Sequence, residues 1–149
     1  HRDIYEGYQK PCLGKYKMSD KNLQFDVISD RRGSLIALEQ NKNIPFQIKR
    51  VYYLYNLDYE KSRGFHAHRK LKQVAICLKG KCSISLDDGK DKQTVILGTP
   101  SKGLFIDNLV WHTMQDFTDD CILMVIASDF YDENDYIRDY NIFLEELIG

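Results

Sequence analysis

The chain has 149 residues, with 21 Lys and Arg against 22 Asp and Glu, so its formal net charge is −1. Proteins that bind nucleic acid over a whole surface carry a strong excess of basic residues, and this chain has none. Hydrophobic residues at 43% and charged residues at 29% are typical of a globular chain. The longest apolar run, residues 121–127, is far shorter than the roughly 20 residues of a membrane-spanning helix. We therefore expect a cytoplasmic protein with neither nucleic-acid nor membrane partners.

Residues 1–17 differ in character from the rest of the chain. They are polar and lack hydrophobic periodicity, whereas Met18 directly precedes a regularly patterned segment. We interpret residues 1–17 as an N-terminal appendage, either a tag remnant or a linker from an upstream domain, and residues 18–149 as one domain.

Short segments rich in Val, Ile, Leu, Phe and Tyr alternate with turn residues over most of the chain. Turn signals include Asp87-Asp88-Gly89 and Gly80, which lies between two lysines. Several short antiparallel strands without intervening helices predict an all-β protein, as a sandwich, a jelly roll or a small antiparallel β-barrel. The predicted strands are residues 25–29, 34–39, 46–57, 73–79, 82–86, 94–97, 104–106 and 121–128.

The C-terminal segment follows a helical period instead. An amphipathic helix is predicted there, covering one end of the β structure, with Asp132 as its N-cap and acidic residues in its first turn. The apolar positions that recur at helical spacing are Tyr136, Tyr140, Phe143 and Leu147.

The four cysteines, Cys12, Cys77, Cys82 and Cys121, form no CxxC pair. This spacing predicts neither a zinc site nor a disulfide framework. We expect reduced and mostly buried thiols.

Three of the four histidines are candidates for proton transfer. His66 and His68 flank Ala67, and side chains two residues apart in an extended segment point to the same face. Two imidazoles with reference pKa values near 6.5 would then face whatever binds there. His112 would approach the same cavity from a later strand. The alternative is a pair of surface histidines on an edge strand.

The same spacing requires a metal to be considered. Metal cupins combine His-x-His, a carboxylate five residues on and a distant histidine, but here the carboxylate position holds Gln73. A neutral amide is a weaker ligand and does not offset the charge of a divalent cation. We therefore expect no metal, which leaves the imidazoles free to move protons.

Charge is unevenly distributed along the chain. Residues 49–72 hold seven Lys and Arg against two acids, whereas residues 116–149 hold ten acids and one Arg, mostly expected on a solvated helix face. The sequence contains no GxGxxG, P-loop, GxSxG or HExxH pattern. It therefore gives no support for dinucleotide-dependent oxidoreduction, NTP hydrolysis, serine hydrolysis or zincin proteolysis. The polar candidates around the basic block are Arg32, Arg50, Tyr52 and Arg63.

Several ordered motifs occur along the chain: residues 50–53 (RVYY), 63–73 (RGFHAHRKLKQ), 87–89 (DDG), 110–112 (VWH) and 127–138 (ASDFYDENDYIR). Together they resemble the WxcM-like sugar 3,4-ketoisomerases. The resemblance implies a cupin-type jelly roll, commonly a dimer, that moves the keto group of dTDP-4-keto-6-deoxyglucose from C4 to C3 without a metal or organic cofactor. It also implies a role in making 3-acetamido sugars for surface polysaccharide such as O-antigen. Some members are fused to an acetyltransferase.

The resemblance and the histidine pattern together suggest roles for the candidates. Isomerisation removes a proton from C3, holds an enediol and delivers a proton to C4. We assign His68 as the carbon base, His66 as partner for the substrate oxygens and His112 as an assisting group. The overall pattern favours the galacto product. Substrate contacts are assigned to Arg32, Arg50, Tyr52, Arg63, Gln73 and His112.

Other functions remain open at this point. A 3,5-epimerase on the same scaffold, a metal-dependent cupin oxygenase or isomerase, and a non-catalytic sugar-nucleotide-binding module all fit part of the pattern. The paired His66 and His68 favour the isomerase. A homodimer is expected, with strands near Phe25 and Leu35 pairing across subunits to protect an open edge.

Overall fold

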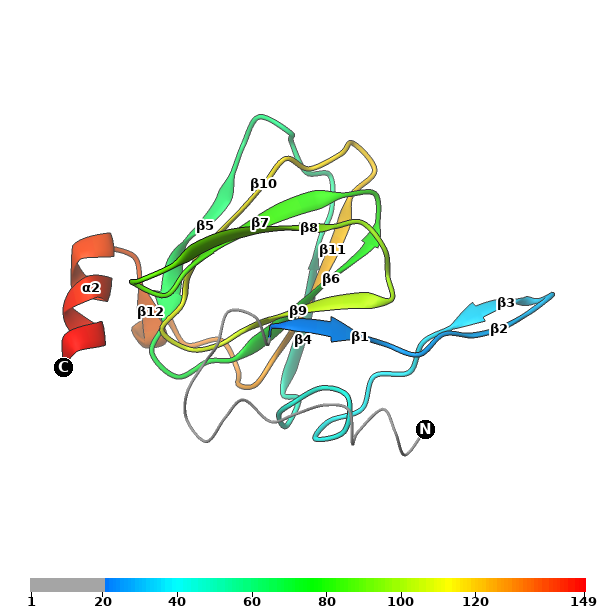
Figure 1. Ribbon diagram of the computed structural model, residues 1–149, viewed down its shortest axis with the longest axis horizontal. Coiled ribbons are helices and arrows are strands. Elements are labelled where there is room, and N and C mark those ends of the chain that lie inside the picture. The colour runs from blue at the N-terminus through cyan, green and yellow to red at the C-terminus, as the bar shows by residue number, and fades with distance from the viewer. Residues whose placement is uncertain (1–20) are drawn as a thin grey trace.

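Two five-stranded antiparallel sheets face each other in this computed structural model, which describes residues 21–149 (Figure 1). The predicted all-β class is therefore confirmed. The appendage expected at residues 1–17 lies outside the described residues, as does Cys12. The first sheet runs β1(Asn22–Gln24), β9(Lys102–Ile106), β6(Gln73–Lys79), β11(Ile122–Ala127), β4(Arg50–Leu54). The second runs β12(Tyr136–Ile137), β5(Arg63–His68), β10(Trp111–Gln115), β7(Cys82–Asp87), β8(Lys92–Leu97).

The two sheets are separate hydrogen-bonded ladders, so within residues 21–149 they form a two-layer jelly roll rather than a closed barrel. β6 is buried on both faces because it runs through the middle of the first sheet. Ala75 and Cys77 point into the core between the sheets, while Val74 and Ile76 pack under residues 36–48 on the outer face. The apolar run of β6 thus serves two hydrophobic layers.

A two-stranded hairpin projects from this body (Figure 1). Its strands β2(Ile28–Asp30) and β3(Gly33–Leu35) pair only with each other in the described part of the chain. Ile28 and Leu35 are 67% and 56% exposed, which leaves apolar surface uncovered on the hairpin. The predicted strands 25–29 and 34–39 correspond to these shorter elements.

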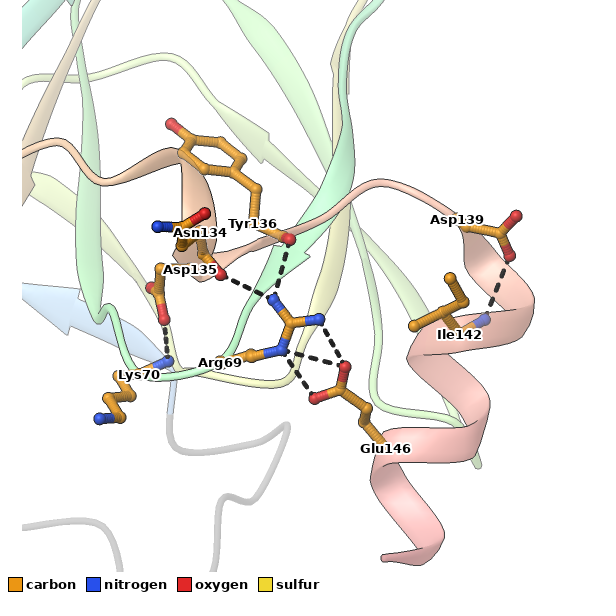
Figure 2. Close-up of polar contacts among 8 residues, drawn as sticks. All are labelled: Arg69, Lys70, Asn134, Asp135, Tyr136, Asp139, Ile142 and Glu146. Atoms are coloured by element: carbon orange, nitrogen blue, oxygen red, sulfur yellow. Dashed lines mark hydrogen bonds and ion pairs between the residues drawn. The ribbon is translucent and has the colours of Figure 1, made fainter.

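The C-terminal helix begins later than the helical spacing predicted. α2(Tyr140–Ile148) is capped by Asp139, whose carboxylate accepts from the backbone N–H group of Asn141 and from that of Ile142, the second of which Figure 2 shows. Asp132 instead caps a single 3₁₀ turn, η3(Glu133–Asp135). Tyr136 is not helical, because the open edge of β5 offers a backbone ladder to β12 and Ile137 is buried there. Tyr140, Phe143 and Leu147 do pack together as predicted.

Among residues 21–149, no helix combines the length and the apolar character that crossing a membrane requires.

Candidate active site

Three imidazoles meet between the sheets. The ring centroid of His66 lies 4.9 Å from that of His68 and 4.6 Å from that of His112, and the latter two are 5.8 Å apart. His66 and His112 are direct partners in the register of β5 and β10. The prediction that these histidines share one face is confirmed, and the surface alternative is wrong because His68 and His112 are buried.

A β-bulge shapes this end of β5. His112 pairs with His66 while Thr113 pairs with Gly64, so Phe65 is the extra residue of the ladder. Phe65 and Gly64 have φ values of 61° and 96°, in the left-handed region. Bulges re-aim side chains beside functional sites, and the left-handed backbone of a bulky Phe65 is strained. The bulge is one reason why β5 escapes detection as a regular strand.

Gly64→Ala is expected to destabilise the protein and to lower its activity together. A Cβ on Gly64 would lie 2.9 Å from the carbonyl oxygen of His112 and 3.2 Å from the Cα of Thr113, at a φ that disfavours alanine. We expect a loss of about 1 to 3 kcal/mol in the free energy of unfolding, measured by urea denaturation. The matched control is Gly98→Ala, whose Cβ would meet only the flexible side chain of Lys81. Equal stability of the two variants would contradict this interpretation.

Tyr136 is a site residue that the sequence analysis missed. Its ring centroid lies 4.4 Å from His68 and 4.9 Å from His66, and the guanidinium carbon of Arg138 lies 4.3 Å from the centre of the tyrosine ring. The helical spacing of the C-terminal segment assigned Tyr136 to a helix face. Its position inside the 127–138 motif is the signal that could have found it.

Arg69 holds the backbone of Tyr136, as Figure 2 shows, and so helps to fix the tyrosine ring beside His66 and His68. Its guanidinium donates to the carbonyl oxygens of Asn134 at 2.8 Å and of Tyr136 at 3.1 Å, and it forms a bidentate ion pair with Glu146 of α2. The carboxylate of Asp135 accepts from the N–H groups of residues 70 and 71. Part of the basic block therefore meets the acidic block, and these charges are structural.

Replacing Arg69 by glutamine is expected to lower kcat by about tenfold to a hundredfold, because displacement of a positioned group by about 1 Å costs that much. Arg69 is a positioning residue that acts through Tyr136. Arg69→Lys keeps the charge but not the fork that holds two carbonyls and a carboxylate, so it should recover little of the loss. Steady-state kinetics with KM resolved from kcat tests this. Full recovery by lysine would show that charge alone matters.

The first sheet supplies the opposite wall of the site. The side-chain N–H of Gln73 donates to the hydroxyl of Tyr52 at 2.8 Å, and the guanidinium carbon of Arg50 lies 5.3 Å from the centre of the Tyr52 ring. A cavity of about 490 Å³ opens beside them, within the range of small-molecule sites. Its polar lining comprises Arg50, Tyr52, Ser62, Arg63, His66, Tyr136 and Arg138.

A smaller cavity of about 180 Å³ is lined by His68, and both Arg50 and Tyr136 line the two cavities. Of the predicted contact residues, Arg32 alone lies elsewhere. It sits at the hairpin turn, where its guanidinium contacts Asp30 and its side chain is 87% exposed.

Unpartnered polar atoms mark this region as a binding site. In the described part of the chain, five buried side-chain atoms lack a hydrogen-bond partner, and all belong to predicted site residues. Buried polar groups are normally paired, so orphans gathered in one place indicate groups left open for a ligand. They are Arg50 Nε, His66 Nδ1, His68 Nε2, Gln73 Oε1 and His112 Nε2.

Burial keeps the imidazoles neutral. Desolvation, followed by the charges of the neighbouring histidines and arginines, lowers the pKa of His68 to about 2. Desolvation and His66 lower the pKa of His112 to about 3. Desolvation and the charge of Arg138 also lower the pKa of His66, but the nearby backbone of Gly64 and the charge of Glu133 oppose this lowering. His112 Nδ1 lies 3.1 Å from the carbonyl oxygen of Val110, which accepts only, so its Nε2 carries a free lone pair.

Nitrogen atoms of the three histidines lie within 4.8 Å of one another, a spacing that a metal ion could use. The fourth position of a metal cupin is occupied by Gln73, whose amide donates to Tyr52 and brings no negative charge. The described residues near the ring cluster therefore provide three neutral donors without a carboxylate ligand. Such a set suits proton transfer and hydrogen bonding better than it suits a divalent cation.

Comparison with known proteins gives consistent matches. A family model described as FdtA, WxcM-like, C-terminal, matches residues 18–147. A TDP-4-oxo-6-deoxy-alpha-D-glucose-3,4-oxoisomerase of Aneurinibacillus thermoaerophilus is 55% identical over 126 residues, covering 85% of this chain and 91% of that protein. A solved 3,4-ketoisomerase from Helicobacter canadensis is 50% identical with a TM-score of 0.84, covering 87% of this chain and 97% of that one.

Two further structures are informative. A histidine-to-asparagine variant of the 3,4-ketoisomerase QdtA from Thermoanaerobacterium thermosaccharolyticum, in complex with TDP-4-keto-6-deoxyglucose, is 44% identical with a TM-score of 0.82, over 85% of this chain and 91% of that one. The 4-keto-6-deoxy sugar epimerase NovW from Streptomyces spheroides is 14% identical with a TM-score of 0.66, over 77% of this chain and 66% of that one. At that identity the likeness concerns the fold alone.

Proposed function

The chain belongs to the WxcM-like family, and from that premise we propose that it is a metal-independent 3,4-ketoisomerase acting on dTDP-4-keto-6-deoxyglucose. The resemblance seen in the sequence motifs is thereby confirmed at the level of the family. The observation that carries the activity is the cluster of three neutral imidazoles, each with a buried ring nitrogen that lacks a hydrogen-bond partner, of which His66 and His68 line the two cavities. The two 3,4-ketoisomerases described above are 55% and 50% identical to this chain.

The reaction needs one base and one route for a proton. The base takes the proton of C3, and the electrons of that C–H bond form the C3–C4 double bond of an enediolate. The C4 carbonyl oxygen takes up negative charge and is then protonated. Protonation at C4 and loss of the proton on the C3 oxygen complete the exchange, so no oxidant or reductant is required.

The geometry favours His66 as the carbon base, opposite to the division of roles that the sequence suggested. His66 lines the cavity of about 490 Å³, and Gly64 and Glu133 oppose the lowering of its pKa. His68 is nearly fully buried, and its pKa of about 2 makes it a weak base. We propose that His68 and His112 contact the substrate oxygens. The ring of Tyr136 packs against His66 and His68 and holds them in place.

The arginines and Tyr52 supply the remaining contacts. Arg50, Arg63 and Arg138 line the cavity as the positive groups that would bind a diphosphate. Tyr52, held by Gln73, presents its hydroxyl to the same space for a sugar hydroxyl. In this proposal the N–H groups of the three guanidinium groups replace the hydrogen bonds that water donates to the diphosphate in solution.

We assign the galacto configuration at C4 to the product. In the gluco ring H3 points to one face, and protonation of C4 from that same face gives galacto. The imidazoles form a single cluster, with His66 within 5 Å of both other rings, so they serve one face of the sugar. The H4–H5 coupling constant in the product NMR spectrum tests this, since a large trans-diaxial coupling would mean the gluco product.

Turnover of dTDP-4-keto-6-deoxyglucose in deuterated water, followed by NMR, tests the activity itself. Deuterium at C4 of a 3-keto product supports the proposal, whereas deuterium at C5 means the 3,5-epimerase. Binding of dTDP without conversion means a non-catalytic module. Turnover that a chelator abolishes and a divalent metal restores means the metal-dependent alternative.

A homodimer through the β2–β3 hairpin is part of the proposal. The hairpin leaves Ile28 and Leu35 exposed, and a groove of about 450 Å³ beside it is lined by Val27, Ile36 and Met124 among others. A second copy is the occupant that we assign to this groove. Arg32 lies outside the site of its own chain, so its predicted substrate contact requires the hairpin of a partner.

Light scattering should give twice the 17.5 kDa chain mass for the wild type and a monomer for Ile28→Glu with Leu35→Glu. Mixing Arg32→Ala and His66→Asn chains should restore activity that neither has, because some mixed sites are intact. A monomeric wild type, or mixed chains that stay inactive, would remove Arg32 from the site.

The biological setting follows from the product. A 3-keto sugar nucleotide is the substrate class of an aminotransferase, whose amine an acetyltransferase would then modify. We place the chain in 3-acetamido sugar synthesis for surface polysaccharide, in the cytoplasm, where buried free thiols stay reduced.

A further inference from the structure

A second cluster of potential ligands lies at the other end of the core from the histidines. Cys77 of β6, Cys82 of β7 and Cys121 just before β11 are all free and at most 1% exposed. Gln73 and Cys77 lie four residues apart on one strand, which separates the two clusters by about 13 Å along β6. Nothing in the ketoisomerase proposal uses these thiols.

The fold brings together cysteines that are 44 residues apart. The turn at Gly80 carries the chain from the first sheet to the second, so Cys77 and Cys82 come from facing sheets. Gly80 has a φ of 73°, and a Cβ there would lie 2.9 Å from the Cα of Cys121. Only glycine lets the segment before β11 approach this closely. Because the fold rather than the sequence spacing brings the three cysteines together, the search for a CxxC pair gave no indication of the cluster.

The spacing of the sulfur atoms suits a metal ion. The three Sγ atoms lie within 4.8 Å of one another, and those of Cys77 and Cys121 are 3.8 Å apart. Metal–sulfur bonds of about 2.3 Å place two thiolates of a tetrahedral or trigonal site about 3.8 to 4.0 Å apart. The thiols therefore need to move by less than about 1 Å to bind one ion in common.

The surroundings are partly preorganised and close to solvent. The Thr118 hydroxyl accepts from the Lys81 N–H at 2.9 Å, and the Thr118 N–H donates to the Lys81 carbonyl at 3.0 Å, which clamps the loop before Cys121 to the Gly80 turn. Lys79 and Lys81 on that turn are exposed, so the cluster lies directly under a surface turn. Opening of this turn provides a route for an ion.

We propose that Cys77, Cys82 and Cys121 form a binding site for one thiophilic d¹⁰ metal ion, Zn²⁺ or Cu⁺, separate from the histidine cluster. Thiolates are the preferred ligands of both ions. Binding converts three S–H groups to metal-bound thiolates and releases the protons to solvent, so affinity rises with pH. A neutral thiol cluster becomes a cross-link between the two sheets, and the bound ion stabilises the fold.

The test uses the full chain in a Cys12→Ser background, so that only the three core thiols remain. Reduced protein titrated with Cd²⁺ should bind one ion per chain and show the ultraviolet charge-transfer band of cadmium thiolates. Cys82→Val, which preserves the packing volume, should weaken binding at least a hundredfold. His66→Asn should leave the band unchanged. Displacement of Cd²⁺ by Zn²⁺ or by Cu⁺ under a reductant then identifies the preferred ion.

A second measurement keeps the proposal testable if Cys82→Val does not fold. In the same background, Zn²⁺ or Cu⁺ should protect the thiols from a disulfide reagent by at least tenfold in rate and raise the melting temperature. Absence of the charge-transfer band, a band that survives Cys82→Val, or thiol reactivity that neither ion changes would each overturn the site.

Discussion

His66→Asn is expected to lower turnover by about 10²- to 10⁴-fold, the contribution of a positioned general base. His66 is the imidazole that lines the cavity of about 490 Å³, and its ring is in contact with His68, His112 and Tyr136. Asparagine keeps a polar side chain of similar reach but cannot accept a carbon-bound proton. The dissociation constant for dTDP should therefore change little while kcat falls.

The comparison variant is His68→Asn, which should lower kcat by a smaller factor of about ten. His68 borders the cavity of about 180 Å³ and contacts the substrate oxygens in our assignment. Exchange of the C3 proton with deuterated solvent separates the roles further, because only loss of the carbon base abolishes it. If His68→Asn lost exchange while His66→Asn kept it, the two roles would be reversed.

The lowered pKa values of His66 and His68 in the ligand-free protein are consistent with this mechanism, because the bound substrate is expected to raise them. Arg50 and Arg138 are among the charges that lower the pKa of His68, and Arg138 also lowers that of His66. A bound diphosphate brings negative charge to these guanidinium groups and opposes their effect on the imidazoles. Substrate binding is therefore expected to raise the pKa of the base and to make it competent.

The sequence predicted the two-histidine feature because it needs only the period of two in an extended strand. β6 was predicted with its observed bounds, since a continuous apolar run between turn residues has few alternatives. Tyr136 escaped because the same apolar spacing suits a helix face, and only the open edge of β5 decides for a strand. Local periodicity carries no information about such a tertiary edge.

The cysteine cluster and the position of Arg32 both show that the sequence does not tell which side chains become neighbours in the fold. Cys77 and Cys121 are neighbours only because the sheets place β6 beside β11. Arg32, predicted to contact an anion, stands on a hairpin that pairs with neither large sheet, and it contacts Asp30. Residue type indicates what a side chain can do, but pairing order decides what it meets.

Acid is expected to destabilise the folded chain steeply between pH 6.5 and 5. His68 and His112 have folded pKa values of about 2 and about 3, while unfolded histidine has a reference pKa near 6.5. Below pH 6.5 the unfolded chain thus binds protons that the folded chain excludes. Stability is full above that pH and falls as the pH decreases.

The expected slope is large because two groups act in the same direction. Each contributes about 1.4 kcal/mol per pH unit once the unfolded histidine is protonated, so the pair contributes roughly 2 to 3 kcal/mol per unit. His66, whose pKa is also lowered, adds to the same slope. The pKa of Glu133, lowered to about 2 by its hydrogen bonds with Arg138, affects stability only below the ordinary glutamate range, outside this window.

Urea denaturation at pH 7.5, 6.5, 6.0 and 5.5 measures this slope. His68→Asn should reduce it by about 1.4 kcal/mol per pH unit, because one of the buried imidazoles is gone. Saturating dTDP should also flatten it, since a bound diphosphate lets the site accept a proton in the folded state. A wild-type stability that stays constant from pH 7.5 to 5.5 would contradict this prediction. It would mean that the histidines of the folded, ligand-free protein take up protons as readily as those of the unfolded chain.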